Sequence, residues 1–445
     1  MEQYLRLYAE PETAALHGLV EALGEKAGWE QVVVIPACNE SAEFLRPPPT
    51  CAGRSLMVLV INESESAFEQ ISLNNRKLAY TVERQFEPVW ESDANGADIQ
   101  MKLLTDASAL RDVLLVDRFS PGRELPVKGG VGHARKIGAD LACWLIGHQK
   151  IGSEWIHCTD ADVELPDTYF SCTDTCAANR SQYAAMIHPF RHCGREDTSE
   201  SRDVLLATRL YEISLHYYVA GMRFAGSPYA FHTIGSTLAI NAAHYAKVRG
   251  FPKRQAGEDF YLLNKLAKVG KVLELDAGRG CEPITIAARR SDRVPFGTGA
   301  AVNSITRLDD PPQDFRFYHP AVFESVRQWL QSWPLLWQSR SATLAGYPPE
   351  LLAGLEALGT RKALVHALAH SRDEDQFNRQ MHTWFDAFRT LKLIHFLRDE
   401  YFPSVHLAQL AANPLFTELL DRDANLQRCR QRLIQDFPQH VALGA

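Results

Sequence analysis

Two aspartates one residue apart, Asp160 and Asp162, form the pattern in this sequence with the clearest chemical meaning. They follow the short and mostly apolar run 155–158, and Pro166 stops any strand soon afterwards. Alternate residues of a strand point to the same side, so a strand ending here would present both carboxylates together. Ligands of α/β sheets bind beside the carboxyl ends of the strands, where paired carboxylates suit Mg²⁺ or Mn²⁺ on a diphosphate. A solvated acidic turn is the alternative interpretation of the same residues.

A second acidic pair, Glu258 and Asp259, follows Gly257 and begins an amphipathic segment that continues to residue 266. A carboxylate held at such a point can act as a general base and take the proton of an attacking hydroxyl group. Acidic residues are also favoured at any helix N-terminus by the helix dipole, whatever the function. The pair alone leaves both interpretations open.

A glycine-rich stretch at residues 128–135 precedes a helix of small and apolar residues and ends in Arg135. Its glycines would allow a ligand to approach the backbone, and the helix start and the arginine would favour an anion. The spacing matches neither a P-loop nor a dinucleotide-binding fingerprint. A purely structural glycine turn is therefore an equal alternative.

Polar residues also follow two apolar, largely β-branched runs, at 31–36 and 56–61, that suit central strands of a parallel sheet. Their side chains could hydrogen-bond a nucleobase, although ordinary capping would explain them equally well. The candidates are Pro36, Asn39, Glu40, Asn62 and Glu63.

The alternation of strand and helix patterns up to about residue 300 predicts an α/β fold with a mainly parallel sheet. Beyond residue 300 the strand patterns stop, and long amphipathic runs predict an α-helical C-terminal region. Its tryptophans are interpreted as core residues. The expected parts are an N-terminal helical segment, a main domain and a helical module, at residues 1–30, 31–300 and 301–445.

The composition is that of a globular enzyme, with 445 residues, 46% of them hydrophobic and 23% charged. The net charge of −7 argues against nucleic-acid binding through bulk charge. No apolar run approaches the length of about 18 residues needed for a transmembrane helix, and the polar N-terminus has no signal-peptide pattern. The nine cysteines include no C-x-x-C pair, so we expect free thiols and a cytoplasmic protein.

Four stretches in this order resemble the motifs of family 2 glycosyltransferases, which have the GT-A fold. They are residues 33–40, 129–140, 159–162 and 257–260, and the resemblance covers about residues 31–300. It implies a GT-A domain, the Rossmann-like mixed sheet of nucleotide-diphospho-sugar transferases. It also implies transfer of a sugar, as in hexosyltransferases, from a nucleotide-linked donor that is most often UDP-linked.

The resemblance also implies roles for the candidate residues. Pro36, Asn39 and Glu40 would line the nucleotide pocket, Glu63 or its neighbour Asn62 would read the base, and Arg135 would contact the donor near the diphosphate. Asp160 and Asp162 would hold Mn²⁺ or Mg²⁺, Asp259 would be the general base, and Glu258 would help to place the acceptor. Arg293, with Arg289 and Arg290, would form a basic lid over the diphosphate, unless these residues are only an exposed basic loop.

Some features depart from the family pattern. The second strand is not followed by the usual pair of aspartates, so the base is undetermined, and no Gln-x-x-Arg-Trp motif follows Asp259, which argues against a processive synthase. The first histidine after Asp259 is His319, in the helical region, so an inverting enzyme is favoured over a retaining one. The alternatives are a nucleotidyltransferase or other nucleotide-sugar enzyme, and a non-catalytic GT-A-like binding protein. The helical module could also form a homodimer interface.

Overall fold

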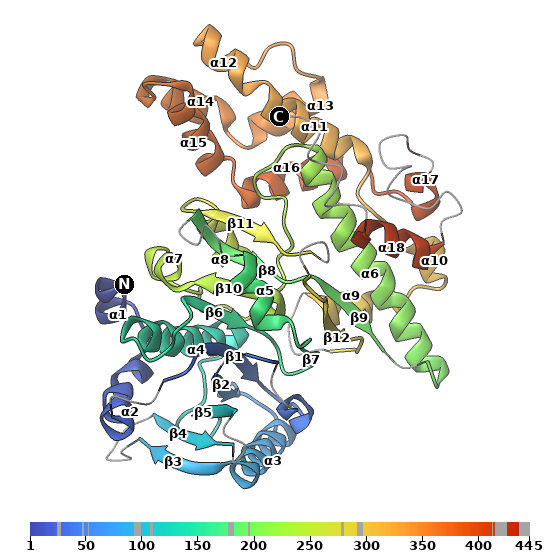
Figure 1. Cartoon of the computed structure of the whole chain (residues 1–445). Coiled ribbons are helices and arrows are strands. Elements are labelled where there is room, and N and C mark those ends of the chain that lie inside the picture. The colour runs from blue at the N-terminus through green and yellow to red at the C-terminus, as the bar shows by residue number, and fades with distance from the viewer. Residues whose placement is uncertain are drawn as a thin grey trace. The chain divides into compact units, whose positions relative to one another are not determined.

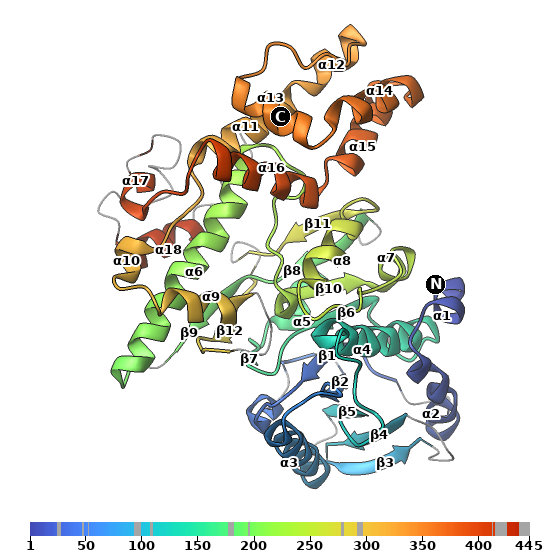
Figure 2. The same ribbon diagram turned by 180° about the vertical axis from the view of Figure 1, so that it is seen from behind.

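The computed structural model describes most of the chain and divides it into two compact units (Figure 1; Figure 2 gives the view from behind). Unit 1 comprises Met1–Cys193 and Thr233–Ala300, and unit 2 comprises Gly194–His232 and Ala301–Ala445. The described residues are 1–24, 28–46, 49–51, 53–92, 99–106, 110–176, 182–194, 196–276, 280–291, 297–411, 413 and 425–435.

Unit 1 is built on a large mixed sheet, to which the described residues contribute nine strands in the order β11-β8-β10-β6-β1-β2-β5-β4-β3. The central strands β5, β2, β1 and β6 are parallel, whereas β10 runs antiparallel to both of its neighbours. The predicted fold class is confirmed: an α/β domain with the mixed sheet expected of a GT-A fold, and helices toward the C-terminus. The strands are β1 (Gln31–Ala37), β2 (Ser55–Asn62), β3 (Glu87–Glu91), β4 (Gln100–Thr105), β5 (Arg111–Arg118), β6 (Trp155–Cys158), β8 (Tyr183–Ile187), β10 (Leu238–Asn241) and β11 (Lys271–Glu274).

Strands β1 and β2 are buried along their whole length because helices cover both faces of the sheet centre. Helix α4 (Gly130–Gly147) packs on β1, β2 and β6, while α3 (Glu69–Gln85) packs on β2 and β3. A Cβ atom at Gly138 would lie only 2.4 Å from Val34 Cγ1, so this glycine sets how closely α4 approaches the sheet. This close packing fixes the helix that carries Arg135.

A second, smaller sheet of unit 1 has the order β7-β12-β9, with β7 (Val163–Glu164), β9 (Phe190–Cys193) and β12 (Ile284–Ala287). Strand β12 pairs antiparallel with β7, which follows Asp162 directly. The backbone N–H of Ala287 donates to the carbonyl oxygen of Asp162 at 3.1 Å. The sheet thus brings the chain around residue 288 beside the acidic pair.

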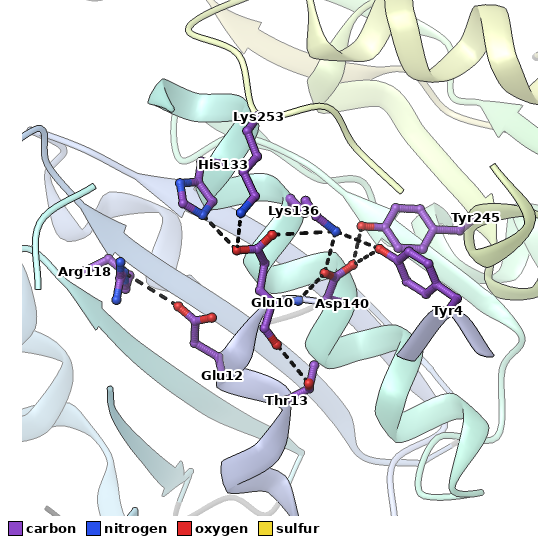
Figure 3. Close-up of polar contacts among 10 residues, drawn as sticks. All are labelled: Tyr4, Glu10, Glu12, Thr13, Arg118, His133, Lys136, Asp140, Tyr245 and Lys253. Atoms are coloured by element: carbon purple, nitrogen blue, oxygen red, sulfur yellow. Dashed lines mark hydrogen bonds and ion pairs between the residues drawn. The ribbon is translucent and has the colours of Figure 1, made fainter. Parts of the chain in front are cut away.

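The N-terminal segment of unit 1 packs on α4 through a buried polar network, shown in Figure 3. The Asp140 carboxylate accepts hydrogen bonds from Tyr245 Oη at 2.7 Å and Lys136 Nζ at 2.7 Å, and also from Tyr4 Oη. The Glu10 carboxylate is paired with Lys253 Nζ at 2.7 Å. Because Asp140 belongs to α4 and also accepts from the backbone N–H of Glu10 at 2.8 Å, these bonds hold the N-terminal segment against the helix. The segment comprises α1 (Glu2–Leu7), the 3₁₀ turn η1 (Pro11–Ala15) and α2 (Leu16–Leu23).

The cysteines differ from the expectation of free thiols. Cys172, in α5 (Tyr169–Cys176), forms a disulfide with Cys281, 109 residues later, and Cys176 lies beside the pair. Among the described residues, the other seven cysteines form no disulfide bond. The expectation was wrong for this pair because its two members lie far apart in the sequence and meet only when the sheet forms.

Unit 2 contains helices and a core rich in aromatic residues, as predicted for its tryptophans. Trp329 is fully buried and contacts the rings of Trp333 and Phe385. The long helix α6 (Ser199–Phe224) packs against α11 (Pro320–Gln331) and α18 (Leu426–Gln435), and a Cβ atom at Gly221 would lie 2.5 Å from the Phe323 ring.

The remaining helices and turns of the chain are η2 (Ala42–Leu45), η4 (Gly235–Thr237), α7 (Ala242–Lys247), α8 (Glu258–Leu266), α9 (Thr298–Ile305), α10 (Pro311–Asp314), α11 (Pro320–Gln331), α12 (Trp333–Ser339), α13 (Pro349–Ala357), α14 (Thr360–His370), α15 (Glu374–Trp384), α16 (Ala387–Glu400), α17 (Leu407–Ala411) and α18 (Leu426–Gln435). Within the described part of the chain, we find no helix with the length and apolar character needed to cross a bilayer.

Candidate active site

The carboxyl ends of three adjacent parallel strands, β2, β1 and β6, meet at one edge of the main sheet. Each strand is followed by candidate residues from the sequence, so the fold brings these groups to one edge of unit 1. Strand β6 ends at Cys158, two residues before Asp160, so the acidic pair lies in the turn after the strand. The expectation that strand alternation would align Asp160 and Asp162 was therefore wrong. Each is oriented instead by a different arginine.

Arg135 is the central residue of the site, and its side chain is only 3% exposed. Its guanidinium donates to Asp160 Oδ1 at 2.8 Å, to Glu258 Oε1 at 3.1 Å and to the carbonyl oxygen of Gly235 at 2.9 Å. A planar fork of donors suits such a multiple contact, which a lysine could not reproduce. Arg135 thus joins the first acidic pair to the second, although the two lie about a hundred residues apart in the sequence.

The glycines before Arg135 accommodate another part of the chain. A Cβ atom at Gly130 would lie 2.5 Å from the Cα of Gln255, and one at Gly132 would lie 2.6 Å from the carbonyl oxygen of Arg254. The N–H of Gly132 donates to that same carbonyl oxygen at 3.0 Å. The close backbone approach is therefore to the segment that leads into α8, which matches the structural alternative that the sequence left open.

The second acidic pair begins α8, where Glu258 is buried and Asp259 is partly exposed. Burial and the neighbouring charge of Glu258 raise the pKa of Asp259 to about 7. The N–H of Phe260 donates to Asp259 Oδ1 at 2.7 Å. A carboxylate with a pKa near neutrality can take up and release a proton under ordinary conditions, which is the property required of a general base.

Arg289 lies at the other side of the acidic pair, just beyond β12. It makes two hydrogen bonds to the Glu40 carboxylate, at 2.9 and 2.5 Å, and its Nη2 lies 2.8 Å from Asp162 Oδ2. Arg289 is one of the three arginines expected to form a basic lid, with Arg290 and Arg293, and Arg293 lies outside the described residues. Arg289 is thus the ion-pair partner of Asp162, as Arg135 is of Asp160.

The polar residues after β1 and β2 are tied together by Asn75 of α3, a fully buried residue that sequence reasoning missed. Asn75 accepts from the backbone N–H of Asn39 at 2.9 Å and donates to Glu63 Oε2 at 3.0 Å and to the carbonyl oxygen of Asn62 at 3.1 Å. Asn39 has a left-handed backbone, with φ of 57°, which asparagine tolerates better than most residues.

The other two candidates here differ in their surroundings. Pro36 is a buried member of β1 and lies opposite Val60 of β2. Asn62 is buried, and its amide donates to the carbonyl oxygen of Ala37 at 3.1 Å. These contacts shape the ends of β1 and β2, and contact of any of these residues with a nucleotide remains a prediction.

Asp160 and Asp162 supply the kind of ligand atoms that a hard divalent cation prefers. Their side chains are 37% and 19% exposed, so an ion can approach both from solvent. Together with Glu40 and Glu258 they make four carboxylates, against the two guanidinium groups of Arg135 and Arg289. This surplus of negative charge and the oxygen donors fit Mg²⁺ or Mn²⁺.

Comparisons with known proteins found similarity in structure only. The sequence matches no protein-family model and no curated protein. The chain is similar to residues 1–349 of S. aureus TarS in complex with UDP-GlcNAc, with a TM-score of 0.33 and 11% identity over 80% of this chain and 91% of that one. It is also similar to the mannosyltransferase PcManGT from Pyrobaculum calidifontis in complex with GDP-Man and Mn²⁺. There the TM-score is 0.31 and the identity 15%, over 89% of this chain and 96% of that one.

Proposed function

We propose that this chain is a glycosyltransferase that moves a sugar from a nucleoside diphosphate to an acceptor hydroxyl group, with inversion at the anomeric carbon. The observation that carries the proposal is the position of Arg135 between Asp160 and Glu258. The buried guanidinium of Arg135 holds Asp160, a carboxylate suited to a metal-bound diphosphate. It also holds Glu258, the neighbour of Asp259, whose carboxylate has a pKa near 7. Sugar transfer needs these two functions close together, because the leaving diphosphate and the attacking hydroxyl act on the same carbon.

The proposed mechanism assigns one role to each group. Asp259 takes the proton of the acceptor hydroxyl, whose oxygen forms a bond to the anomeric carbon while the bond from that carbon to the diphosphate oxygen breaks. Asp160 and Asp162 would hold Mg²⁺ or Mn²⁺, which would supply positive charge to stabilise the departing diphosphate. Arg135 keeps Asp160 and Glu258 in place and is a positioning residue.

The nucleotide would lie at the ends of β1 and β2, beside Pro36, Asn39 and Glu40, with Glu63 or Asn62 toward the base. Asn39 is exposed just after β1 and offers hydrogen-bonding groups that a nucleobase can use. We expect a UDP-linked donor, and we expect any self-association to use the helices of unit 2. Size-exclusion chromatography with light scattering tests the latter.

A donor screen tests the proposed function. We expect one or a few nucleotide sugars, from a panel linked to UDP, GDP, dTDP and CMP, to raise the melting temperature with Mn²⁺ and not with EDTA. The Asp160→Asn and Asp162→Asn variants should lose this response. Asp167→Asn is the matched control, since Asp167 is an exposed acid in the same stretch, outside the acidic pair. The proposal fails if, with or without Mn²⁺, no donor in the panel stabilises the protein and none is hydrolysed even slowly.

A further inference from the structure

The position of Arg289 is fixed by the backbone of the smaller sheet. Ile286 of β12 pairs with Val163 of β7, and Ala287 bonds to the carbonyl group of Asp162. Arg289 follows two residues later. Its Cα position is thus linked to the acidic turn itself, whereas its side chain is long enough to change partners.

The Arg289 side chain connects two acidic groups that come from different strand ends. It bonds to both oxygens of Glu40, after β1, and to Asp162, after β6. Glu40 is largely shielded, with 8% of its side chain exposed, whereas Arg289 is 34% exposed and can be reached from solvent. The Glu40 carboxylate binds both terminal nitrogens of Arg289, whereas Asp162 Oδ2 lies against Nη2, and Asp162 is the more exposed carboxylate, at 19% against 8%. Asp162 is therefore the partner that Arg289 can release at lower cost.

We propose that Arg289 is an internal counter-cation of the donor site, which exchanges Asp162 for the diphosphate of an incoming metal-bound nucleotide while it stays anchored to Glu40. This inference rests on the proposed function and assigns a regulatory role within that site. Without a nucleotide, the guanidinium neutralises Asp162 and competes with a divalent cation for the same carboxylate, because two cations on one carboxylate repel each other. With a nucleotide present, the diphosphate offers Arg289 a new anionic partner, and guanidinium groups bind phosphate oxygens through paired hydrogen bonds.

The exchange has a consequence for binding that can be measured. Metal alone should bind weakly, because it must displace Arg289 without compensation. Metal and diphosphate together should bind much more tightly, because the displaced guanidinium gains a partner. Arg289 would thus couple the two ligands, and such coupling is reciprocal by thermodynamic necessity.

The test compares two binding measurements on the full-length protein. Free Mn²⁺ is titrated by electron paramagnetic resonance without nucleotide, and UDP or GDP is titrated by calorimetry at saturating Mn²⁺. For Arg289→Ala we expect the affinity for Mn²⁺ alone to rise about 10-fold and that for the diphosphate to fall by about 10- to 100-fold, the range of ordinary coupling energies. Arg289→Lys, which keeps the charge without the fork, should lie between the wild type and the alanine variant in both titrations.

The matched control is Arg191→Ala. Arg191 lies on β9 of the same small sheet, is exposed, and donates to Thr285 Oγ1 of β12 at 3.2 Å. This variant should leave both affinities unchanged, so it separates loss of the Arg289 guanidinium from any general loosening of β12.

The opposite signs of the two changes make the inference refutable. If Arg289→Ala weakens both affinities, or changes neither while the wild type binds Mn²⁺ and diphosphate, the exchange is wrong and the proposed function stands. If Arg191→Ala has the same effects as Arg289→Ala, the sheet and not the guanidinium is responsible, and the inference also fails. If the wild type binds neither Mn²⁺ nor any diphosphate, the proposed function fails, and this inference with it.

Discussion

Replacement of Arg135 by methionine should destabilise unit 1 severely, because it leaves a buried carboxylate without its counter-charge. The side chains of Arg135 and Glu258 are 3% and 4% exposed. Breaking a buried ion pair by removing one partner costs about 3–5 kcal/mol. Asp160 adds little to this figure, because its side chain is 37% exposed and water screens its charge. We therefore expect the free energy of unfolding to fall by about 3–5 kcal/mol, nearly all of it from Glu258.

Urea denaturation followed by tryptophan fluorescence measures this loss, and a double-mutant cycle assigns it. In the variant that combines Arg135→Met with Glu258→Met neither charge of this buried pair remains, so at least about half of the lost stability should return. The control is Arg209→Met, which breaks the exposed pair of Arg209 with Glu196, 34% and 58% exposed, and should cost less than about 1 kcal/mol. A loss below 1 kcal/mol in Arg135→Met, or a double variant less stable than that single variant, would refute the reasoning.

Three further predictions concern the acidic groups. Asp259→Asn should retain the affinity for donor and lower kcat by about 10²- to 10⁴-fold, as measured by calorimetry and steady-state assay; near-normal turnover would remove Asp259 as the base. Since Asp259 must be ionised to accept a proton and its pKa is raised to about 7, kcat/KM of the wild type should rise with pH up to about 7 and then level off. Burial would raise the pKa of Glu10, but hydrogen bonds from His133 and Lys253 outweigh it and lower the pKa from 4.5 to about 2. Glu10 should therefore stabilise the fold fully above pH 4.5 and lose this contribution as the pH falls toward 2. Wild type and Glu10→Gln should accordingly converge in melting temperature at low pH, and a constant difference would contradict this.

The central strands of the fold could be predicted from the sequence because their burial leaves a local signal. Gln31–Ala37 and Ser55–Asn62 are β-branched and apolar runs, which only a sheet covered on both faces can bury completely. The helices after residue 300 were equally visible through their amphipathic period. The grouping of α6 could not be predicted, because nothing in residues 199–224 indicates that this helix packs with α11 and α18 and belongs to unit 2, although the strands before and after it in sequence belong to unit 1.

The residues of the candidate site could be named from the sequence, but their partners could not. Asp160, Asp162 and Asp259 stand in recognisable local patterns, whereas the contacts of Arg135 and Arg289 span between 25 and 249 residues. A glycine gives no sign of whether a ligand or another segment occupies the space it leaves. Beside Gly130 and Gly132, this space is occupied by residues 252–255 of the same chain.

The two arginines differ in a way that bears on the proposed chemistry. Arg135 is almost fully buried and holds three acceptors from distant parts of the chain, so its release would cost several hydrogen bonds at once. Arg289 is partly exposed, and its partner Asp162 is itself 19% exposed. The arginine partner of Asp160 is therefore fixed by the fold, whereas in the proposed exchange the arginine partner of Asp162 moves to a ligand. A site that binds and releases a diphosphate in every cycle needs both properties, a rigid carboxylate to define the position and an exchangeable one to respond to the ligand.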